Sequence, residues 1–220
     1  MKNKYFIILN VLIISLIINS CAGVIGFRKT GTAKSAIKAT EQKDLPPVKF
    51  EDFENGTLAG AYNYANKAGG ASANYMISTP GEPAHSGQYS AKAIVNTGTD
   101  SDWGCGFGAS TSYGQGYADA TGRTKISVWI KAPEGMTFYI FCNEASANGA
   151  DGEFYNSPDQ TGSGDWKEYI VPFDEFFRNI YSGNQTGNYE LDPSGVGTVG
   201  LQVGGNQGKG VLYIDDIYLK

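Results

Sequence analysis

Hydrophobic and polar residues alternate with a period of two along much of the chain after residue 47. Between Thr198 and Gly204, every second side chain is aliphatic, and the positions between them are glycine or glutamine. This period places successive side chains on opposite faces of a β-strand, so one face is expected to be core and the other a small, polar surface. The stretch from Lys125 to Lys131 follows the same rule, with three aliphatic residues on one face and Trp129 on the other.

Short apolar runs of this kind are separated by clusters of Gly, Ser, Asn and Asp, at spacings typical of an all-β sandwich. Residues 47–220 are enough for one domain with a substantial core. Helix signals are few, and only residues 174–181 (DEFFRNIY) predict one or two helical turns. The expected strands are residues 48–53, 75–78, 89–95, 103–107, 125–131, 137–143, 165–171, 198–203 and 211–219.

The first 20 residues are typical of a secretory signal. Two lysines precede an apolar run from Phe6 to Ile18, which is shorter than the roughly 20 residues of a membrane-spanning helix. The sequence Ile18-Asn19-Ser20-Cys21 then resembles a bacterial lipobox, which implies cleavage before Cys21 and attachment of diacylglycerol to its sulfur. An ordinary signal peptide with an incidental cysteine is the alternative. We therefore expect a lipid-anchored protein of the bacterial cell envelope, on either the inner or the outer membrane.

Residues 21–46 are polar and low in aromatic residues, which predicts a flexible tether. The domain that follows is acidic: residues 48–220 contain 10 Lys and Arg against 20 Asp and Glu, a net charge of −10. Such a surface repels phosphate backbones, so no nucleic-acid partner is expected. Neutral partners and divalent cations are favoured, and we expect a monomer.

Two cysteines, Cys105 and Cys142, lie within the domain. Outside the cytoplasm they are able to form one disulfide. Two separate, buried free thiols are an equally good interpretation, and the sequence leaves both open.

Five stretches of the domain form a recognisable set: FEDFENG (50–56), HSGQYSAKAIV (85–95), ISVWIKAP (126–133), DWKEYIVPFDEF (165–176) and VLYIDDIYL (211–219). Together they resemble carbohydrate-binding modules of the galactose-binding-like β-sandwich type, nearest to families 4, 11, 22 and 30. The resemblance implies a jelly-roll of two antiparallel sheets over residues 47–220, and a polysaccharide or oligosaccharide as the partner.

The resemblance also implies a structural Ca²⁺ ion that links the first strand, the loop that begins at His85 and the last strand. Calcium takes six to eight oxygen ligands, from carboxylates and backbone carbonyls. The expected ligands are Asp52, Glu54 and Asp215, while strand alternation places Asp216 on the opposite face. The alternative is that these acids are solvated or accept backbone N–H bonds.

A glycan site needs aromatic rings on which sugars stack, and amides or carboxylates that pair with hydroxyl groups. Packing within the sandwich is the alternative for each aromatic residue, and Trp129 and Trp166 are assigned to packing. The candidate ligand-binding residues are Trp103, Tyr113, Tyr139, Asn143, Glu144, Tyr155 and Gln202.

We expect no catalysis. A glycosidase needs two carboxylates on either side of the scissile bond, and nothing identifies such a pair beyond the loop acids Glu144 and Glu153. The single histidine is too few for the metal clusters of hydrolases. The sequence therefore predicts a non-catalytic glycan-binding lipoprotein. The alternatives are a surface lipoprotein that makes structural or protein contacts, and a small glycoside hydrolase or lyase.

Overall fold

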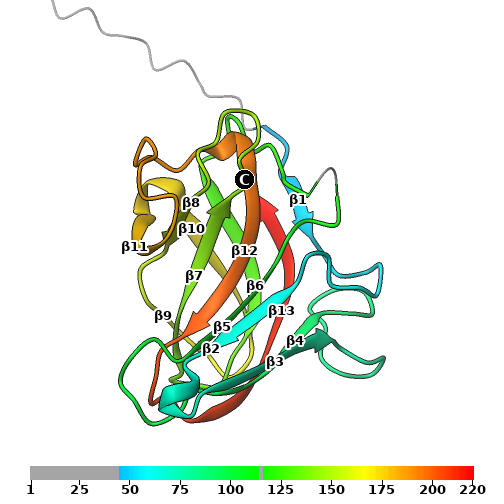
Figure 1. The fold of residues 1–220 in the computed structure, drawn as a ribbon. Coiled ribbons are helices and arrows are strands. Elements are labelled where there is room, and N and C mark those ends of the chain that lie inside the picture. The colour runs from blue at the N-terminus through cyan, green and yellow to red at the C-terminus, as the bar shows by residue number, and fades with distance from the viewer. Residues whose placement is uncertain (1–44, 114–115) are drawn as a thin grey trace, which may run out of the picture. The chain divides into compact units, whose positions relative to one another are not determined.

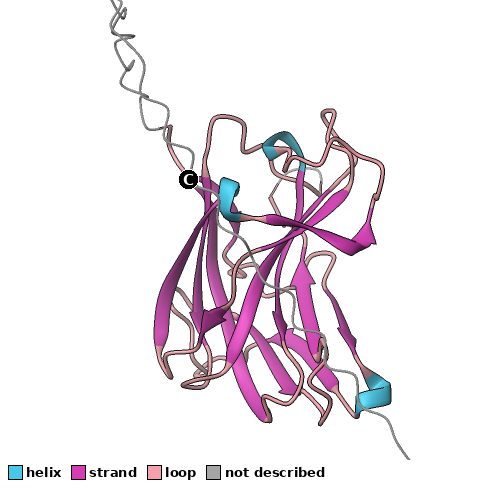
Figure 2. Cartoon of the chain, turned by 90° about the vertical axis from the view of Figure 1, so that its left-hand side faces the viewer, coloured by secondary structure: helices cyan, strands magenta, loops and turns pink. Residues whose placement is uncertain are grey.

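The computed structural model describes residues 45–113 and 116–220, which form two antiparallel β-sheets packed face to face (Figures 1 and 2). The all-β sandwich expected from the sequence is confirmed. The predicted signal peptide (1–20), Cys21 and nearly all of the predicted tether (21–46) lie outside the described residues. Within the described part, no helix is long and apolar enough to cross a membrane.

Sheet A has the strand order β10-β6-β13-β4-β3, and β1 pairs with the far end of β13. The last strand, β13, is thus central, because β4 pairs with its first half, β6 pairs with it from Tyr213 to Leu219, and β1 joins its end. Its strands are β1 (Val48–Glu51), β3 (Ser72–Ile77), β4 (Ala91–Asn96), β6 (Lys125–Lys131), β10 (Trp166–Pro172) and β13 (Lys209–Leu219).

Sheet B has the order β11-β8-β7-β12-β5-β2, and the short β9 pairs with the start of β7. The two edges of this sheet, β2 and β11, are therefore separated by four strands. Its strands are β2 (Tyr62–Ala65), β5 (Cys105–Ala109), β7 (Thr137–Glu144), β8 (Glu153–Asn156), β9 (Gln160–Thr161), β11 (Phe177–Gly183) and β12 (Val196–Val203), and the 3₁₀ turns are η1 (Lys67–Gly69), η2 (Phe173–Glu175) and η3 (Pro193–Gly195).

The core lies between the sheets, and its strands have the predicted alternation. The three aliphatic residues of β6 are buried while Trp129 faces outward, and in β12 the core-facing residues are Val199, Leu201 and Val203. Burial of each large apolar side chain contributes about 1.5–3 kcal/mol. The opposite face of β12 is lined by glycine, threonine and glutamine, as the sequence predicted.

Two expectations on secondary structure are corrected. Residues 174–181 do not form a helix: a single 3₁₀ turn, η2, leads directly into β11. The strands β2, β8, β9 and β11 were not expected, and all four belong to sheet B.

The two cysteines have free, buried thiols. Cys105 lies opposite Val203 and Cys142 opposite Val199, on either side of β12. Four residues along a strand span about 13 Å, beyond the roughly 7 Å between Cα atoms that a disulfide tolerates. The free-thiol interpretation therefore holds, and burial raises the pKa of the Cys105 thiol to about 11.

Candidate ligand-binding groove

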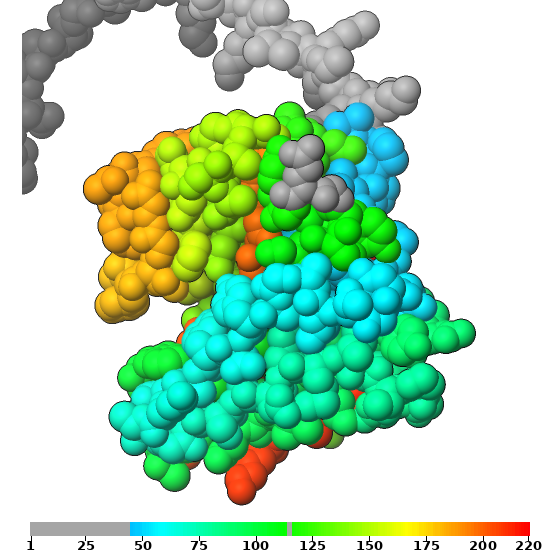
Figure 3. All heavy atoms as spheres, turned by 45° about the vertical axis from the view of Figure 1, so that its right-hand side comes forward, coloured from blue at the N-terminus to red at the C-terminus, as the bar shows by residue number. Residues whose placement is uncertain are grey.

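A groove with a volume of about 1370 Å³ lies on the face of sheet B that points away from the core. In Figure 3 the surface is indented between the segment around β2, in cyan, and the segment around β11, in gold. The groove is lined by side chains from β2, β7, β8, β11 and β12, and from the loops before β5 and after β12. It thus extends over the whole width of the sheet.

Glycines on two central strands set the depth of the groove. A Cβ atom at Gly106 would lie 2.3 Å from Cζ of Tyr64, and one at Gly200 would lie 2.3 Å from Cζ of Phe141. Real Cβ atoms essentially never approach other atoms so closely, so both rings occupy space that only glycine leaves free. The rings of Tyr64 and Phe141 consequently lie against the backbone of the sheet.

Four aromatic residues form one cluster at the β2 side of the groove: Tyr62, Tyr64, Trp103 and Phe141, called here the aromatic cluster. The ring centroid of Tyr64 lies 6.3 Å from that of Tyr62, 5.9 Å from that of Trp103 and 6.3 Å from that of Phe141. Tyr62 and Trp103 remain 38% and 39% exposed. A cluster of packed rings that still shows this much surface is suited to contact an apolar ligand face.

Hydrogen bonds fix the cluster from below. The hydroxyl of Tyr64 donates to Oε1 of Gln202 (2.8 Å), and Nε2 of Gln202 donates to the backbone carbonyl of Trp103 (2.8 Å). Nδ2 of Asn143 donates to the hydroxyl of Tyr62 (3.0 Å). Burial raises the pKa of Tyr62 to about 12, so its hydroxyl stays protonated at neutral pH. Gln202 and Asn143 therefore orient the rings that a ligand would meet.

Of the candidate binding residues, Trp103, Tyr139, Asn143 and Gln202 all line the groove. Glu144 lines a smaller adjoining pocket of about 350 Å³.

The Glu144 carboxylate accepts the N–H groups of Glu153 (3.0 Å) and Asp192 (2.6 Å). Burial raises its pKa against these donors. Its oxygens thus hold the backbone in place rather than reach into the groove.

The structure places Tyr113 and Tyr155 away from the groove. The hydroxyl of Tyr113 donates to Oδ1 of Asp52 (2.6 Å), beside β1. Tyr155 is buried, and its hydroxyl donates to Oε2 of Glu153 (3.0 Å). In β8 the neighbouring Phe154 faces the groove instead.

Sequence reasoning missed several groove residues, mainly because they belong to strands that were not expected. The signal in β2 was present: in Tyr62-Asn63-Tyr64 two aromatic residues are spaced by two and therefore share one strand face. Apart from the core residue Phe138, the missed groove-lining aromatic residues are Tyr62, Tyr64, Phe141, Phe154, Phe177 and Tyr181.

The charges in the groove are few. Asp102 and Asp159 line it and are exposed, and its only cationic lining residue within the described chain, Arg178, is engaged by the carboxylate of Glu153 (3.5 Å). The remaining polar lining includes Asn156, and is mostly amide and hydroxyl. The groove thus offers hydrogen-bonding groups and rings rather than a cationic surface.

The three expected calcium ligands do not come together. Asp52 contacts Nζ of Lys49 (2.6 Å) as well as the Tyr113 hydroxyl. Although burial raises the pKa of Asp52, the hydrogen bonds from Lys49 and Tyr113 outweigh it and hold that pKa below its usual range. Glu54 accepts the N–H groups of Gln88 and Tyr89.

Asp215 accepts the N–H groups of His85 (2.8 Å) and Ser86 (3.1 Å), and burial raises its pKa to about 7 against these donors. Among the described residues, no three His, Cys, Asp or Glu side chains gather in a way that could hold a metal ion. These acids as arranged do not fit a Ca²⁺ ion, and calcium stays an untested prediction.

Asp215 and Asp216 do not follow simple strand alternation. The register of β13 against β6 shifts after Asp215, and Asp216 has a positive φ of 47°. The resulting bulge lets both carboxylates contact the same residue, since Oδ2 of Asp216 lies 2.7 Å from Nδ1 of His85. The ring of His85 in turn stacks on Trp129, with 3.6 Å between centroids. The two acids therefore anchor one loop to the outer face of sheet A.

Comparison with known proteins gives one family and one group of similar structures. The family model described as Complex I intermediate-associated protein 30 (CIA30) matches residues 60–214, well over half of the chain. No curated protein matches the sequence.

Two similar solved structures are of the family 11 carbohydrate-binding module of Clostridium thermocellum. The module of the cellulosomal cellulase Lic26A-Cel5E has 21% identity and a TM-score of 0.58, and the match covers 80% of this chain and 95% of the module. The same type of module in complex with a β-1,3-1,4-mixed-linked tetrasaccharide has 21% identity and a TM-score of 0.57, with 80% and 96% covered. At this identity the likeness establishes the fold, as the sequence resemblance implied.

Proposed function

The chain belongs to the Complex I intermediate-associated protein 30 (CIA30) family, and from that starting point we propose that it is a non-catalytic glycan-binding protein. A polysaccharide would lie in the groove of sheet B and stack on the aromatic cluster. The observation that carries this proposal is the position of Tyr64 and Phe141 on a glycine floor, with Tyr62 and Trp103 exposed beside them. Exposed rings gathered in one groove favour a binding surface, whereas single exposed aromatic residues do not.

The charges of the groove favour a neutral glycan. Asp102 and Asp159 would repel the carboxylates of uronic acids, and Arg178 is already paired with Glu153. Amide groups such as that of Asn156 are suited to sugar hydroxyls. The solved module that holds a mixed-linked tetrasaccharide has the same fold, which supports this class of ligand.

The absence of catalysis is also part of the proposal. General acid–base chemistry on a glycoside needs two carboxyl groups free to reach the scissile bond. The oxygens of Glu144 bond to backbone N–H groups, and Glu153 is fully buried beside Arg178 and Tyr155. Neither is available to a ligand in the groove.

A polysaccharide panel tests the proposal. The full-length protein, solubilised in detergent, would be run through affinity gels that contain β-glucan, mannan, xylan or pectin. We expect retardation by at least one neutral polysaccharide, weaker retardation by pectin, and no release of reducing ends. A folded protein that none of the gels retards would overturn the glycan-binding proposal, and released product would overturn the non-catalytic one.

We further propose that the protein is anchored to an envelope membrane through a lipid on Cys21. The lipobox-like sequence before Cys21 supports this, and residue 21 lies outside the described structure. Cys21→Ser is expected to move the protein from the membrane fraction to the soluble fraction of a bacterial host, and to abolish labelling by radioactive palmitate. Equal labelling of the wild type and Cys21→Ser would contradict the anchor.

A second candidate is protein binding through sheet A. Ile94 of β4 and Val211 of β13 are paired in register and exposed, and Ile170 of β10 is exposed on the same sheet. These apolar side chains are scattered rather than gathered in a groove, which gives them less weight. If the panel shows no glycan binding, sheet A becomes the surface to examine.

A further inference from the structure

The far wall of the groove is an arch in strand β11. Arg178 pairs with Tyr155 and Gly183 pairs with Glu153, so residues 179–182 stand opposite the single residue Phe154. These four residues leave the ladder and project from the edge of the sheet, as the curl of β11 in Figure 1 shows. We call residues 179–182 the arch.

The arch carries the most exposed large aromatic side chain of the described chain. Tyr181 is 92% exposed and Ile180 is 61% exposed, and both line the groove that contains the aromatic cluster. Four strands lie between β11 and β2, the strand that holds Tyr62 and Tyr64. Five strand spacings amount to about 24 Å along the sheet. The groove therefore has two aromatic ends that a small molecule would not reach together.

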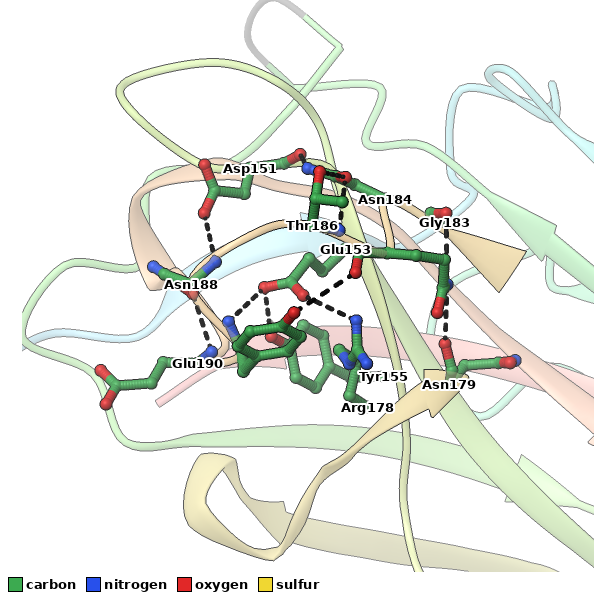
Figure 4. Close-up of polar contacts among 12 residues, drawn as sticks. Asp151, Glu153, Tyr155, Arg178, Asn179, Gly183, Asn184, Thr186, Asn188 and Glu190 are labelled. Atoms are coloured by element: carbon green, nitrogen blue, oxygen red, sulfur yellow. Dashed lines mark hydrogen bonds and ion pairs between the residues drawn. The ribbon is translucent and has the colours of Figure 1, made fainter. Parts of the chain in front are cut away.

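A buried ion pair fixes the first end of the arch, at Arg178. The carboxylate of Glu153 is fully buried, and its Oε1 lies 3.5 Å from Nη1 of Arg178. Figure 4 shows this carboxylate between the Tyr155 hydroxyl and the Arg178 side chain. Among the described residues, neither Oε1 of Glu153 nor Nη1 of Arg178 has a hydrogen-bond partner. At these two atoms, each charge is therefore balanced mainly by the other. The guanidinium also lies over the ring of Tyr189, 4.2 Å from its centroid.

The same glutamate, Glu153, also holds the second end of the arch, at Gly183. The backbone of Glu153 pairs with Gly183, and its Oε2 accepts the N–H of Tyr189 (2.8 Å) from the segment that follows the arch. From just beyond the arch, Nε2 of Gln185 donates to the carbonyls of its last and first residues, Ser182 (2.7 Å) and Asn179 (3.2 Å). The arch is thus closed on itself and attached at both ends to one residue.

We propose that Tyr181 binds a sugar unit at the β11 end of the groove, and that Glu153 is the positioning residue of the arch. This inference rests on the proposed glycan-binding function and specifies the ligand as a chain long enough to span the sheet. Contact with a second aromatic residue on the same chain raises affinity through effective concentration, but only when the chain reaches both ends. Short oligosaccharides would use the aromatic cluster alone.

A chain-length series tests this inference. Affinities of the full-length, detergent-solubilised protein would be measured by calorimetry for β-1,3-1,4-mixed-linked gluco-oligosaccharides, from the disaccharide up to the polysaccharide. The wild type is expected to gain affinity with length. Tyr181→Ala is expected to lose about tenfold for the longest chains, the size of one aromatic contact, and nothing for the shortest. Tyr181→Trp should retain the length dependence.

Matched variants separate binding from stability. Glu153→Gln keeps the side-chain shape but leaves Arg178 unpaired, and is expected to reproduce the length-specific loss. Glu190→Gln removes an exposed carboxylate of the same segment, and Tyr113→Ala removes an exposed tyrosine outside the groove. Both should match the wild type at every length.

The outcomes distinguish this inference from the function it rests on. No binding of any length by the wild type would overturn the proposed function on this glycan and the role of Tyr181 with it. Wild-type binding that Tyr181→Ala leaves unchanged, or lowers equally at all lengths, would overturn the role of Tyr181 alone. Since Tyr181 is exposed, its replacement should not change the melting temperature.

Discussion

Replacement of Glu51 by alanine is expected to lower the free energy of unfolding by about 4 kcal/mol, because three backbone N–H groups lose their acceptor. The Glu51 side chain is fully buried at the end of β1. Its Oε1 accepts the N–H groups of Asp52 (3.0 Å) and Phe53 (2.9 Å), and its Oε2 accepts that of Ser112 (2.8 Å). Phe53 has a positive φ of 59°, so the same carboxylate also supports a strained turn.

The loss would be measured by urea denaturation, where a lower midpoint with an unchanged slope reports a change in stability. A loss of this size in a domain of this length corresponds to roughly 10 °C in melting temperature. Glu51→Gln keeps one acceptor oxygen and should lose less, while Glu175→Ala removes an exposed glutamate and serves as the matched control. A loss below about 1 kcal/mol for Glu51→Ala would show that water replaces the carboxylate.

Replacement of Tyr64 by alanine is expected to lower glycan affinity by about 100-fold, which corresponds to about 2.7 kcal/mol. Tyr64 contacts all three other rings of the aromatic cluster, and through Gln202 it fixes the backbone of Trp103. Replacement of Tyr64 removes one ring on which a sugar would stack, and it leaves the Trp103 ring less firmly held.

Tyr64→Phe keeps the ring and removes only the bond to Gln202, so its loss should be about fivefold, the size of one hydrogen bond. Affinity electrophoresis on whichever neutral polysaccharide binds the wild type measures both variants, and circular dichroism checks that each is folded. A folded Tyr64→Ala protein that binds within a few fold of the wild type would place the ligand elsewhere.

The sequence allowed prediction of the strands whose inner faces are aliphatic. Three of the four missed strands, β2, β8 and β11, instead place aromatic residues on the outer face of sheet B. In β8 the buried residues are Glu153 and Tyr155, and Phe154 faces the groove, so the usual order of polar outside and apolar inside is reversed. Such a reversal is expected at a functional surface, where the side chains are chosen for a ligand rather than for the core.

The candidate site was predictable in part for the same reason. The polar face of residues 198–204 indicated Gln202. In the strand at residues 137–143, Tyr139 and Asn143 are an even number of positions apart and therefore share one face. No strand was expected around Tyr155, so nothing in the sequence showed that its side chain is buried. The loop residue Tyr113 has no periodicity to place it, and only the fold shows that it lies beside β1. The arch could not be foreseen, since its sequence is compatible with a helical turn.

Binding in the groove would depend on the glycines beneath Tyr64 and Phe141, although no ligand would touch them. A single added methyl group at Gly106 or Gly200 would lift a ring off the sheet and fill the groove from below. Sequence drift at these positions would therefore weaken binding although no aromatic or amide residue had been replaced. Among related chains, glycine at these two positions would therefore indicate glycan binding more reliably than the tyrosines above them.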